Sequence, residues 1–308
     1  MIARRVRAGA LIVLCASVSF TAVSCFRRPV PPPEVSILFT GDTAGNLDKC
    51  RCRGRWVGGI ARRATAVREK GAARPGPTVV LDVGNMISAA NDVGIKQLEY
   101  LMAAYDRMGY AAVNVGRREA QLDLETLRAV QRLANVSFTS ANVLAAETGE
   151  PAFRPWVVVE LGGHTLGVIG VLSDRDPELK LGTGLQLAAP AEALRRQMPQ
   201  LSARCSLVVV LACAREEEMK ALAEQVPEVD VFLGGEARRY PEEILRDRQK
   251  RVLLVGNVGK DMGFLHLQVD PLGRVLSVEA ERVELGKGFD EDEEMLGIVK
   301  QYKESLTK

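Results

Sequence analysis

Histidine and aromatic residues are scarce in this 308-residue chain, which has two histidines, His164 and His266, and only 5% Phe, Trp and Tyr. Two histidines exclude a metal site built mainly from imidazoles, and so few aromatics leave no platform for stacking nucleobases. Both histidines are expected to be structural, His164 in a Gly-Gly turn and His266 within a predicted strand. The chain has 41 basic and 39 acidic residues. Because this balance lacks the excess of positive charge that binds nucleic acid, we expect no nucleic acid among the partners.

A hydrophobic run long enough for a typical membrane span is also missing near the N-terminus. Residues 8–23 are apolar for about 16 positions and follow three arginines, which is typical of a signal peptide covering residues 1–24. The segment Thr21-Ala22-Val23-Ser24-Cys25 resembles a bacterial lipoprotein box, with Cys25 as the lipidated residue, and ordinary secretion is the alternative. Residues 26–33 are proline-rich and predict a stiff tether. We expect an extracytoplasmic lipoprotein anchored to a membrane.

From residue 34 onward, apolar runs of strand length alternate with segments of helical period, which is typical of a layered α/β fold. Strands are predicted at residues 35–40, 78–82, 111–115, 156–160, 166–171, 207–212, 229–233, 252–255, 263–269 and 275–283. Helices are predicted at residues 59–70, 94–108, 124–134, 191–201, 215–225 and 291–305. Helices separate the early strands, whereas short turns join the later ones. We therefore predict a four-layer α/β/β/α sandwich of two mixed sheets, in one domain over residues 34–308.

Five strand ends carry the candidate site, because ligands of open α/β sheets gather at the carboxyl ends of strands. They read TGDTAG (40–45), LDVGN (81–85), NVGRRE (114–119), LAC (211–213) and DVFLGGEAR (230–238). With these motifs in this order, and with GGIAR (58–62), MGYAAV (108–113), ANV (141–143) and NVGK (257–260), the chain resembles the calcineurin-like metallophosphoesterase domain of the 5'-nucleotidase and UDP-sugar hydrolase family.

That resemblance implies two divalent metals, which in the family bind phosphate and generate a hydroxide nucleophile. It also implies that a second, base-stacking domain would follow, and because the chain stops after the predicted helix 291–305 we expect no C-terminal nucleotidase domain. The family's ligand positions fall on Asp42 (retained), Ala44 (for His), Asn85 (for a bridging Asp), Arg117 (for Asn), Cys213 (for His), and Glu236 and Arg238 (for two His), while Arg118 stands at the position of the family's catalytic His.

Arg117 and Arg238 at two of the ligand positions oppose metal binding, since a guanidinium is a cation that only donates hydrogen bonds. We therefore expect that the family's two metals do not bind. Two alternatives use the same positions. Asp42, Asn85, Cys213 and Glu236 are residual ligands for a rebuilt single-metal site, whereas Arg117, Arg118 and Arg238 are candidates to hold a phosphate or carboxylate directly, or to form internal ion pairs.

Cys50 and Cys52 form a Cys-Arg-Cys motif flanked by basic residues, a setting that favours the thiolate. Three interpretations stay open: a structural disulfide within the motif or to Cys205 or Cys213, a redox pair, or a soft-metal site for one Zn or Cu that adds Cys213 and Asp42 or Glu236. Cys205 alone is better explained as core packing. The loop also resembles a bacterial branch of the same family with Cys-x-Cys or Cys-x-selenocysteine here, which implies a redox or soft-metal role.

The sequence thus predicts a 5'-nucleotidase homologue with an eroded dinuclear site that is not a working phosphohydrolase. Its candidate catalytic residues are Cys50 and Cys52, acting with an unidentified redox or protein partner. The alternatives are a phosphoester hydrolase with a rebuilt metal site and a metal-free anion-binding or scaffold module.

Overall fold

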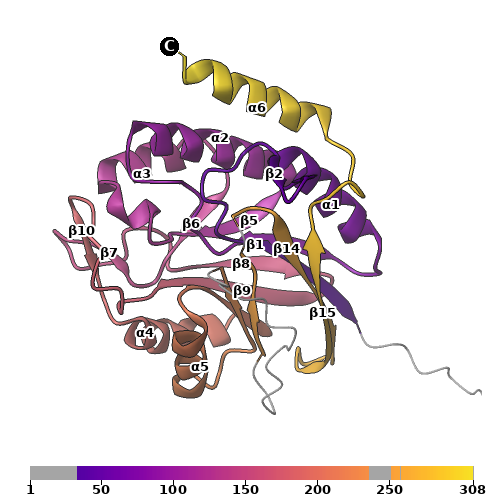
Figure 1. The fold of residues 1–308 in the computed structure, drawn as a ribbon. Helices are drawn as coiled ribbons and strands as arrows, with labels where there is room; N and C mark the ends of the chain where they lie inside the picture. The colour runs from indigo at the N-terminus through magenta and orange to yellow at the C-terminus, as the bar shows by residue number, and fades with distance from the viewer. Residues whose placement is uncertain (1–32, 236–250, 257, 308) are drawn as a thin grey trace, which may run out of the picture. The chain divides into compact units, whose positions relative to one another are not determined.

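Two mixed β-sheets form the centre of the computed structural model, which describes residues 33–235, 251–256 and 258–307 (Figure 1). The first sheet has the order β15-β14-β1-β4-β5-β6, and the second has the order β13-β12-β11-β9-β8. Strands β1, β4, β5 and β6 run parallel, as do β9, β11, β12 and β13, while β14, β15 and β8 pair antiparallel with their neighbours.

The strand bounds are β1 (Glu34–Thr40), β4 (Thr78–Asp82), β5 (Tyr110–Asn114), β6 (Ser137–Thr139), β8 (Trp156–Leu161), β9 (His164–Leu172), β11 (Leu207–Cys213), β12 (Val231–Gly234), β13 (Arg251–Leu254), β14 (Asp261–Val269) and β15 (Val275–Glu284).

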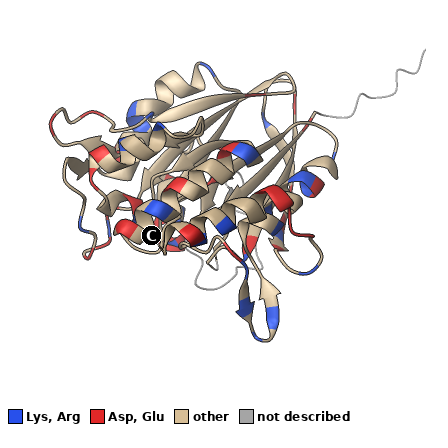
Figure 2. Cartoon of the chain, turned by 90° about the horizontal axis from the view of Figure 1, so that it is seen from above, with Lys and Arg blue, Asp and Glu red and all other residues tan. Residues whose placement is uncertain are grey.

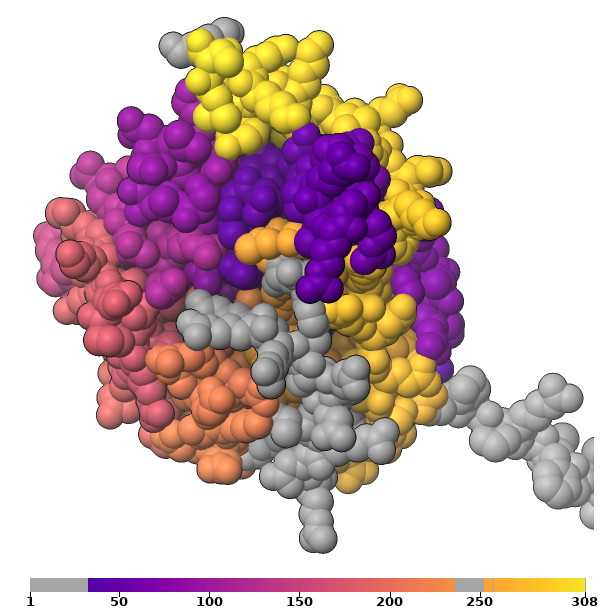
Figure 3. Space-filling view, viewed as in Figure 1, coloured from indigo at the N-terminus to yellow at the C-terminus, as the bar shows by residue number. Residues whose placement is uncertain are grey.

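Helices cover the outer faces of both sheets. They are α1 (Ile60–Ala72), α2 (Asp92–Met108), α3 (Leu124–Gln131), α4 (Pro190–Ser202), α5 (Glu216–Gln225) and α6 (Glu293–Ser305). The first three share a core with the first sheet, and α4 and α5 share one with the second. Helix α6 packs on α1 and α2, and Figure 3 shows this yellow C-terminal surface beside the indigo surface near the N-terminus. The predicted four-layer sandwich is confirmed.

A third core lies between the two sheets, and strand periodicity explains it. Val35, Ile37 and Phe39 of β1 pack with the second sheet, whereas Leu38 faces the helices. The sheets approach most tightly where side chains are absent. A Cβ atom on Gly170 of β9 would lie only 2.1 Å from the carbonyl oxygen of Thr139 on β6, so this position requires glycine.

The predicted strands and helices are all present, with strand ends shifted by at most two residues. Helix α3 ends three residues early, because Arg132 caps its last turn. His164 is not in the turn but is the buried first residue of β9. Five short strands were not predicted, since three residues carry no recognisable period: β6 and the pairs β2 (Cys50–Cys52) with β3 (Arg55–Val57) and β7 (Val143–Ala145) with β10 (Leu185–Leu187).

Several predicted features lie outside the described residues, namely the signal peptide, Cys25, most of the tether, Glu236 and Arg238. Residues 32–308 form one compact unit. Within the ranges that are described, no helix combines the length and apolarity that crossing a membrane requires.

The close approach of the sheets predicts the effect of one methyl group. We expect Gly170→Ala to lower the free energy of unfolding by about 3 kcal/mol, because the new Cβ overlaps backbone of the other sheet. Gly288→Ala is the control, since a Cβ there meets no atom within 4 Å. Urea denaturation of both variants checks this, and equal stability of the two would contradict the packing described.

Candidate functional site

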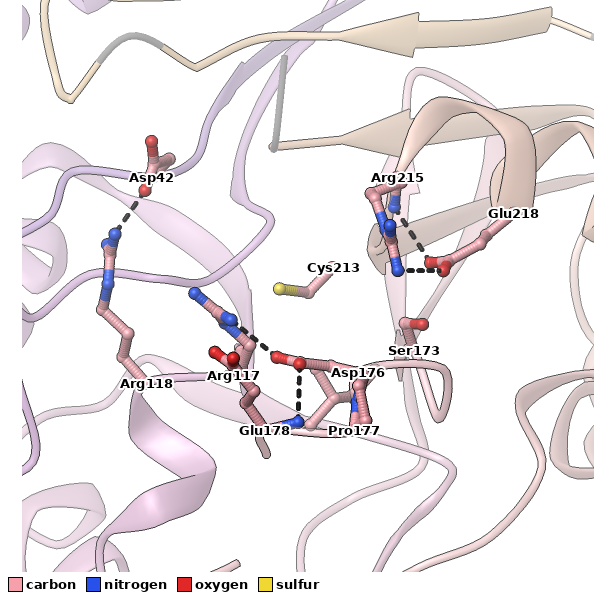
Figure 4. Close-up of a pocket in the computed structure, with 11 residues that line it drawn as sticks. Asp42, Arg117, Arg118, Ser173, Asp176, Pro177, Glu178, Cys213, Arg215 and Glu218 are labelled. Carbon is pink, nitrogen blue, oxygen red and sulfur yellow. Dashed lines mark hydrogen bonds and ion pairs between the residues drawn. The ribbon is translucent and has the colours of Figure 1, made fainter. Parts of the chain in front are cut away.

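The carboxyl ends of strands from both sheets meet at a cleft of about 400 Å³ (Figure 4). Its wall includes Asp42 after β1, Arg117 and Arg118 after β5, Asp176 and Glu178 after β9, and Cys213, Arg215 and Glu218 at and after the end of β11. The structure therefore brings together Asp42, Arg117, Arg118 and Cys213 of the predicted site residues. Glu236 and Arg238 are outside the described residues.

Backbone strain marks the loops that follow β1 and β4. Asp42, Ala44 and Asn85 have φ values of 48°, 53° and 59°, in the left-handed region that side chains other than glycine rarely adopt. The two loops are joined by backbone hydrogen bonds from Asp42 N to Gly84 O (2.9 Å) and from Ala44 N to Asn85 O (3.0 Å). The loops thus keep an unfavourable conformation even though Ala44 offers no ligand atom, which indicates that a wider network holds them.

A buried polar network holds the first of these loops. Arg63 of α1 is fully buried and donates to Thr43 Oγ1 (3.0 Å) and Tyr105 Oη (2.8 Å), and Tyr105 Oη donates to Asp82 Oδ2 (2.8 Å). Burial raises the pKa of Asp82 and, with the Asp82 charge, that of Tyr105. Burial opposes the charge of Arg63, but Tyr105, Tyr110 and Asp82 hold its pKa above the usual value.

Glu119 fixes the backbone of the second loop. Its buried carboxylate accepts hydrogen bonds from the backbone N–H groups of Asn85, Met86, Ile87 and Gly116 at 2.8–3.0 Å. Burial raises the pKa of Glu119, and the N–H donors oppose that rise. This residue is the retained end of the Gly-Arg-Arg-Glu motif, and it positions the loop rather than facing the cleft.

Arg118 engages both residual ligand positions of the first two strand ends. Its Nη1 lies 2.9 Å from Asp42 Oδ1 (Figure 4). Its backbone N–H donates to Asn85 Oδ1 at 3.2 Å. The side chains of Arg118 and Asp42 are only about one-fifth exposed, so the ion pair is partly shielded from water. The Asp42 carboxylate is therefore already engaged by a guanidinium.

The remaining arginines of the cleft are also paired. Arg117 Nη1 lies 2.6 Å from Asp176 Oδ2, and Arg215 Nη2 lies 3.4 Å from Glu218 Oε1. In the cleft wall as described, three arginines thus face four carboxylates. The arrangement matches internal ion pairs better than an anion site at Arg117 and Arg118. The sequence analysis did not identify Asp176 and Glu218 as the partners of these arginines. Asp176 follows the carboxyl end of β9, so the rule that ligands gather at the carboxyl ends of strands could have indicated it.

The donor set does not fit the two divalent metals that the fold family implies. Ala44 has no donor, and the Arg117 and Arg118 side chains bring positive charge and donate only. Asp42 is already paired with Arg118. Across the residues that the structure describes, no three His, Cys, Asp or Glu side chains are grouped to hold an ion, so Cys50, Cys52 and Cys213 are not brought together as a ligand set.

Cys50 and Cys52 lie on a hairpin that projects with its basic residues from the rest of the unit (Figure 2). Strand β2 pairs with β3 through a two-residue turn in which Arg53 and Gly54 both have positive φ (49° and 81°), as in a type I′ turn. Both cysteines are half-buried free thiols, whereas Arg51 between them is exposed, so the two thiols share one face of β2. The Lys260 ammonium donates to Cys52 Sγ at 3.8 Å.

Cys205, Cys213 and His266 lie in partly or fully buried positions. Cys205 packs against the core beside α4, and burial raises the pKa of its thiol. Cys213 is buried in the cleft wall. His266 is buried on β14, with Nδ1 3.1 Å from Ser36 Oγ and Nε2 3.2 Å from Glu34 Oε2, away from the strand ends that form the cleft.

The Arg117 pair predicts a measurable pKa. The hydrogen bond from Arg117 holds the pKa of Asp176 below its ordinary value. The pair therefore stabilises the fold at pH values above the ordinary pKa of the carboxyl group, and this stabilisation is lost as the pH falls through the folded-state pKa. We expect Arg117→Met to raise the Asp176 pKa, as read by carbon NMR titration of the carboxyl group. Arg107→Met, which removes an exposed pair with Glu294, is the control and should leave Asp176 unchanged.

Known proteins share both the sequence pattern and the fold. No family model matches the chain. The 5'-nucleotidase of Bos taurus is 25% identical over 307 residues, covering 89% of this chain and 53% of its own length, and that of Diplobatis ommata is 27% identical over 308 residues, covering 89% and 52%. The chain thus spans about half the length of the curated relatives it matches.

Solved structures show the same fold. A 5'-nucleotidase precursor from Thermus thermophilus superposes with a TM-score of 0.77 at 23% identity, covering 89% of this chain and 59% of the other. The calcineurin-like phosphoesterase YfkN of Bacillus subtilis superposes with a TM-score of 0.73 at 18% identity, covering 89% and 98%. The chain is a homologue of the 5'-nucleotidases and has the calcineurin-like metallophosphoesterase fold.

Proposed function

We propose that this protein is a non-hydrolytic relative of the 5'-nucleotidases that works outside the cytoplasm through reversible oxidation of Cys50 and Cys52. The observation that carries the proposal is the pair of half-buried thiols on one face of β2, one of them in contact with the Lys260 ammonium. Oxidation passes two electrons from the dithiol to a partner disulfide, which becomes a dithiol as the hairpin disulfide forms.

Loss of hydrolysis is supported by the position of Arg118. In a dinuclear hydrolase the carboxylate at Asp42 would neutralise metal charge, but here it neutralises a guanidinium at 2.9 Å. A metal entering beside Asp42 would have to break that ion pair and lie next to a fixed positive charge, which Coulomb repulsion opposes.

Strand geometry favours a reactive rather than a structural disulfide. Residues two apart in a strand have Cα atoms about 6.7 Å apart, at the upper limit for a disulfide, and parallel Cβ vectors where a disulfide needs Cβ atoms about 3.8 Å apart. Strand β2 must therefore bend when Cys50 and Cys52 join. A strained disulfide is readily reduced, so the pair suits cycling between dithiol and disulfide.

The soft-metal alternative finds less support. Two thiolates supply half of a tetrahedral zinc set, and within the described ranges no third Cys, His, Asp or Glu joins them. The location rests on the leader pattern, with a lipid on Cys25 as the proposed anchor. Relatives named as a precursor and as venom proteins agree with a route out of the cytoplasm.

The purified chain should not hydrolyse AMP or p-nitrophenyl phosphate with Mn²⁺, Co²⁺ or Zn²⁺ present, because Arg118 blocks the metal position at Asp42. Product phosphate measured against the Asp42→Asn variant checks this, since activity equal in both is contamination. Hydrolysis that Asp42→Asn abolishes would instead establish the rebuilt metal site.

The thiol count should fall by two when the chain is equilibrated with an excess of a small disulfide, and both thiols should return under mild reduction without unfolding. Peptide mass spectrometry should locate the bridge between Cys50 and Cys52, with Cys205 unchanged because burial suppresses its thiolate. A bridge that resists reduction until the protein unfolds, or one bound Zn or Cu that protects both thiols, would contradict the proposal.

A further inference from the structure

We propose that Cys52 is the attacking thiol of this pair, that Cys50 resolves, and that the hairpin selects anionic disulfides. The inference rests on the proposed redox function. It assigns a different role to each cysteine and a chemical class to the substrate, and both follow from how charge is distributed around β2.

Lys260 distinguishes the two thiols. Its ammonium lies 3.8 Å from Cys52 Sγ. Of the two basic residues next to Cys50 in the chain, Lys49 is paired with Glu291 at 2.7 Å, and Arg51 adjoins Cys50 and Cys52 equally. A cation beside a sulfur stabilises the thiolate, which is the nucleophile in disulfide exchange. Cys52 is therefore the thiol prepared for attack.

The turn that carries Lys260 is held in an unfavourable conformation. Val258 and Gly259 have φ values of 51° and 74°, and a β-branched residue is rare in this left-handed region. The turn also packs closely on the end of the hairpin, since a Cβ on Gly58 would lie 3.1 Å from Gly259 O. The fold thus maintains local strain to hold Lys260 against Cys52.

The charge around Cys52 selects the substrate. Arg51 and Arg53 flank Cys52, are exposed, and make no ion pair with any residue that the structure describes. Arg55, opposite Cys52 on β3, is exposed and pairs loosely with Glu284 at 3.2 Å. In the part of the cleft wall that is described, by contrast, Arg117, Arg118 and Arg215 each have a carboxylate partner. The positive field of the hairpin attracts an anionic disulfide.

The exchange proceeds in two balanced steps. The Cys52 thiolate attacks one sulfur of the substrate disulfide, forms a mixed disulfide and releases the other sulfur as a thiolate. Cys50, on losing its proton to water, attacks Cys52 Sγ, which releases the second substrate sulfur and closes the Cys50–Cys52 bridge. Two electrons pass to the substrate. Because strain in β2 favours reduction of the closed bridge, a dithiol reverses the reaction and an excess of the substrate disulfide drives it forward.

Three small disulfides of different charge test the inference: dithiodipropionate (2−), hydroxyethyl disulfide (neutral) and cystamine (2+). In the Cys50→Ser variant, mass spectrometry should find the mixed disulfide on Cys52, forming about tenfold faster with the dianion than with the dication. The difference should nearly vanish in 1 M salt. In the matched Cys52→Ser variant, Cys50 should react more slowly than Cys52 does in the Cys50→Ser variant. Its preference for the dianionic over the dicationic disulfide should also be smaller.

Lys260 is tested as a positioning residue by rescue. Lys260→Met should slow the reaction of Cys52 about fivefold, and Lys260→Arg should restore it, which a merely structural lysine would not do. Lys70→Met, which removes a pair with Glu281 elsewhere on the surface, is the control.

The outcomes separate the two proposals. Equal rates for Cys50 and Cys52, or equal rates for anionic and cationic disulfides, would overturn this inference while the redox pair stands. If neither thiol exchanges with any of the three disulfides, both proposals are overturned.

Discussion

The buried guanidinium of Arg63 supports both the loop that carries Asp42 and the turn that carries Lys260. It hydrogen-bonds Thr43, the neighbour of Asp42, and a Cβ on Gly259, the neighbour of Lys260, would lie 3.3 Å from its Nη2. A buried charge is stable only while its partners stay in place, and removing one leaves a penalty of several kcal/mol. This network explains how the strand-end loops keep a strained, site-like conformation with no metal ligand at Ala44.

The fold was predictable from sequence because burial imposes a period on long elements. Residues of β1 alternate between two cores, and β11 is buried along its whole length, as the apolar runs indicated. The β2–β3 hairpin was missed for the opposite reason. Its strands are three residues long, one face is exposed, and its turn reads Arg-Gly rather than the Asn-Gly that signals a type I′ turn.

The candidate site was predictable only in part. Strand order and the strand-end rule bring Asp42, Arg118 and Cys213 to one cleft, as expected. No sequence rule could pair Arg117 with Asp176, because these residues are 59 positions apart on different sheets and their pairing depends on side-chain geometry. The contact between Lys260 and Cys52, 208 residues apart, was equally hidden. The sequence showed Lys260 as the last residue of the NVGK motif (257–260), but it did not show that the Lys260 side chain reaches Cys52.

The distribution of charge differs between the cleft and the β2–β3 hairpin. Each arginine of the cleft is neutralised by a carboxylate, so these side chains are stabilised as they stand and attract a ligand only weakly. Replacing Arg118 alone would remove the ion pair with Asp42 at 2.9 Å and would still leave no donor atom on the Ala44 side chain. On the hairpin, by contrast, Arg51 and Arg53 are exposed beside a thiol, where the charge remains available to an incoming anion. The proposed redox chemistry therefore lies at the β2–β3 hairpin, whereas the arginines described in the cleft wall are each engaged by a carboxylate.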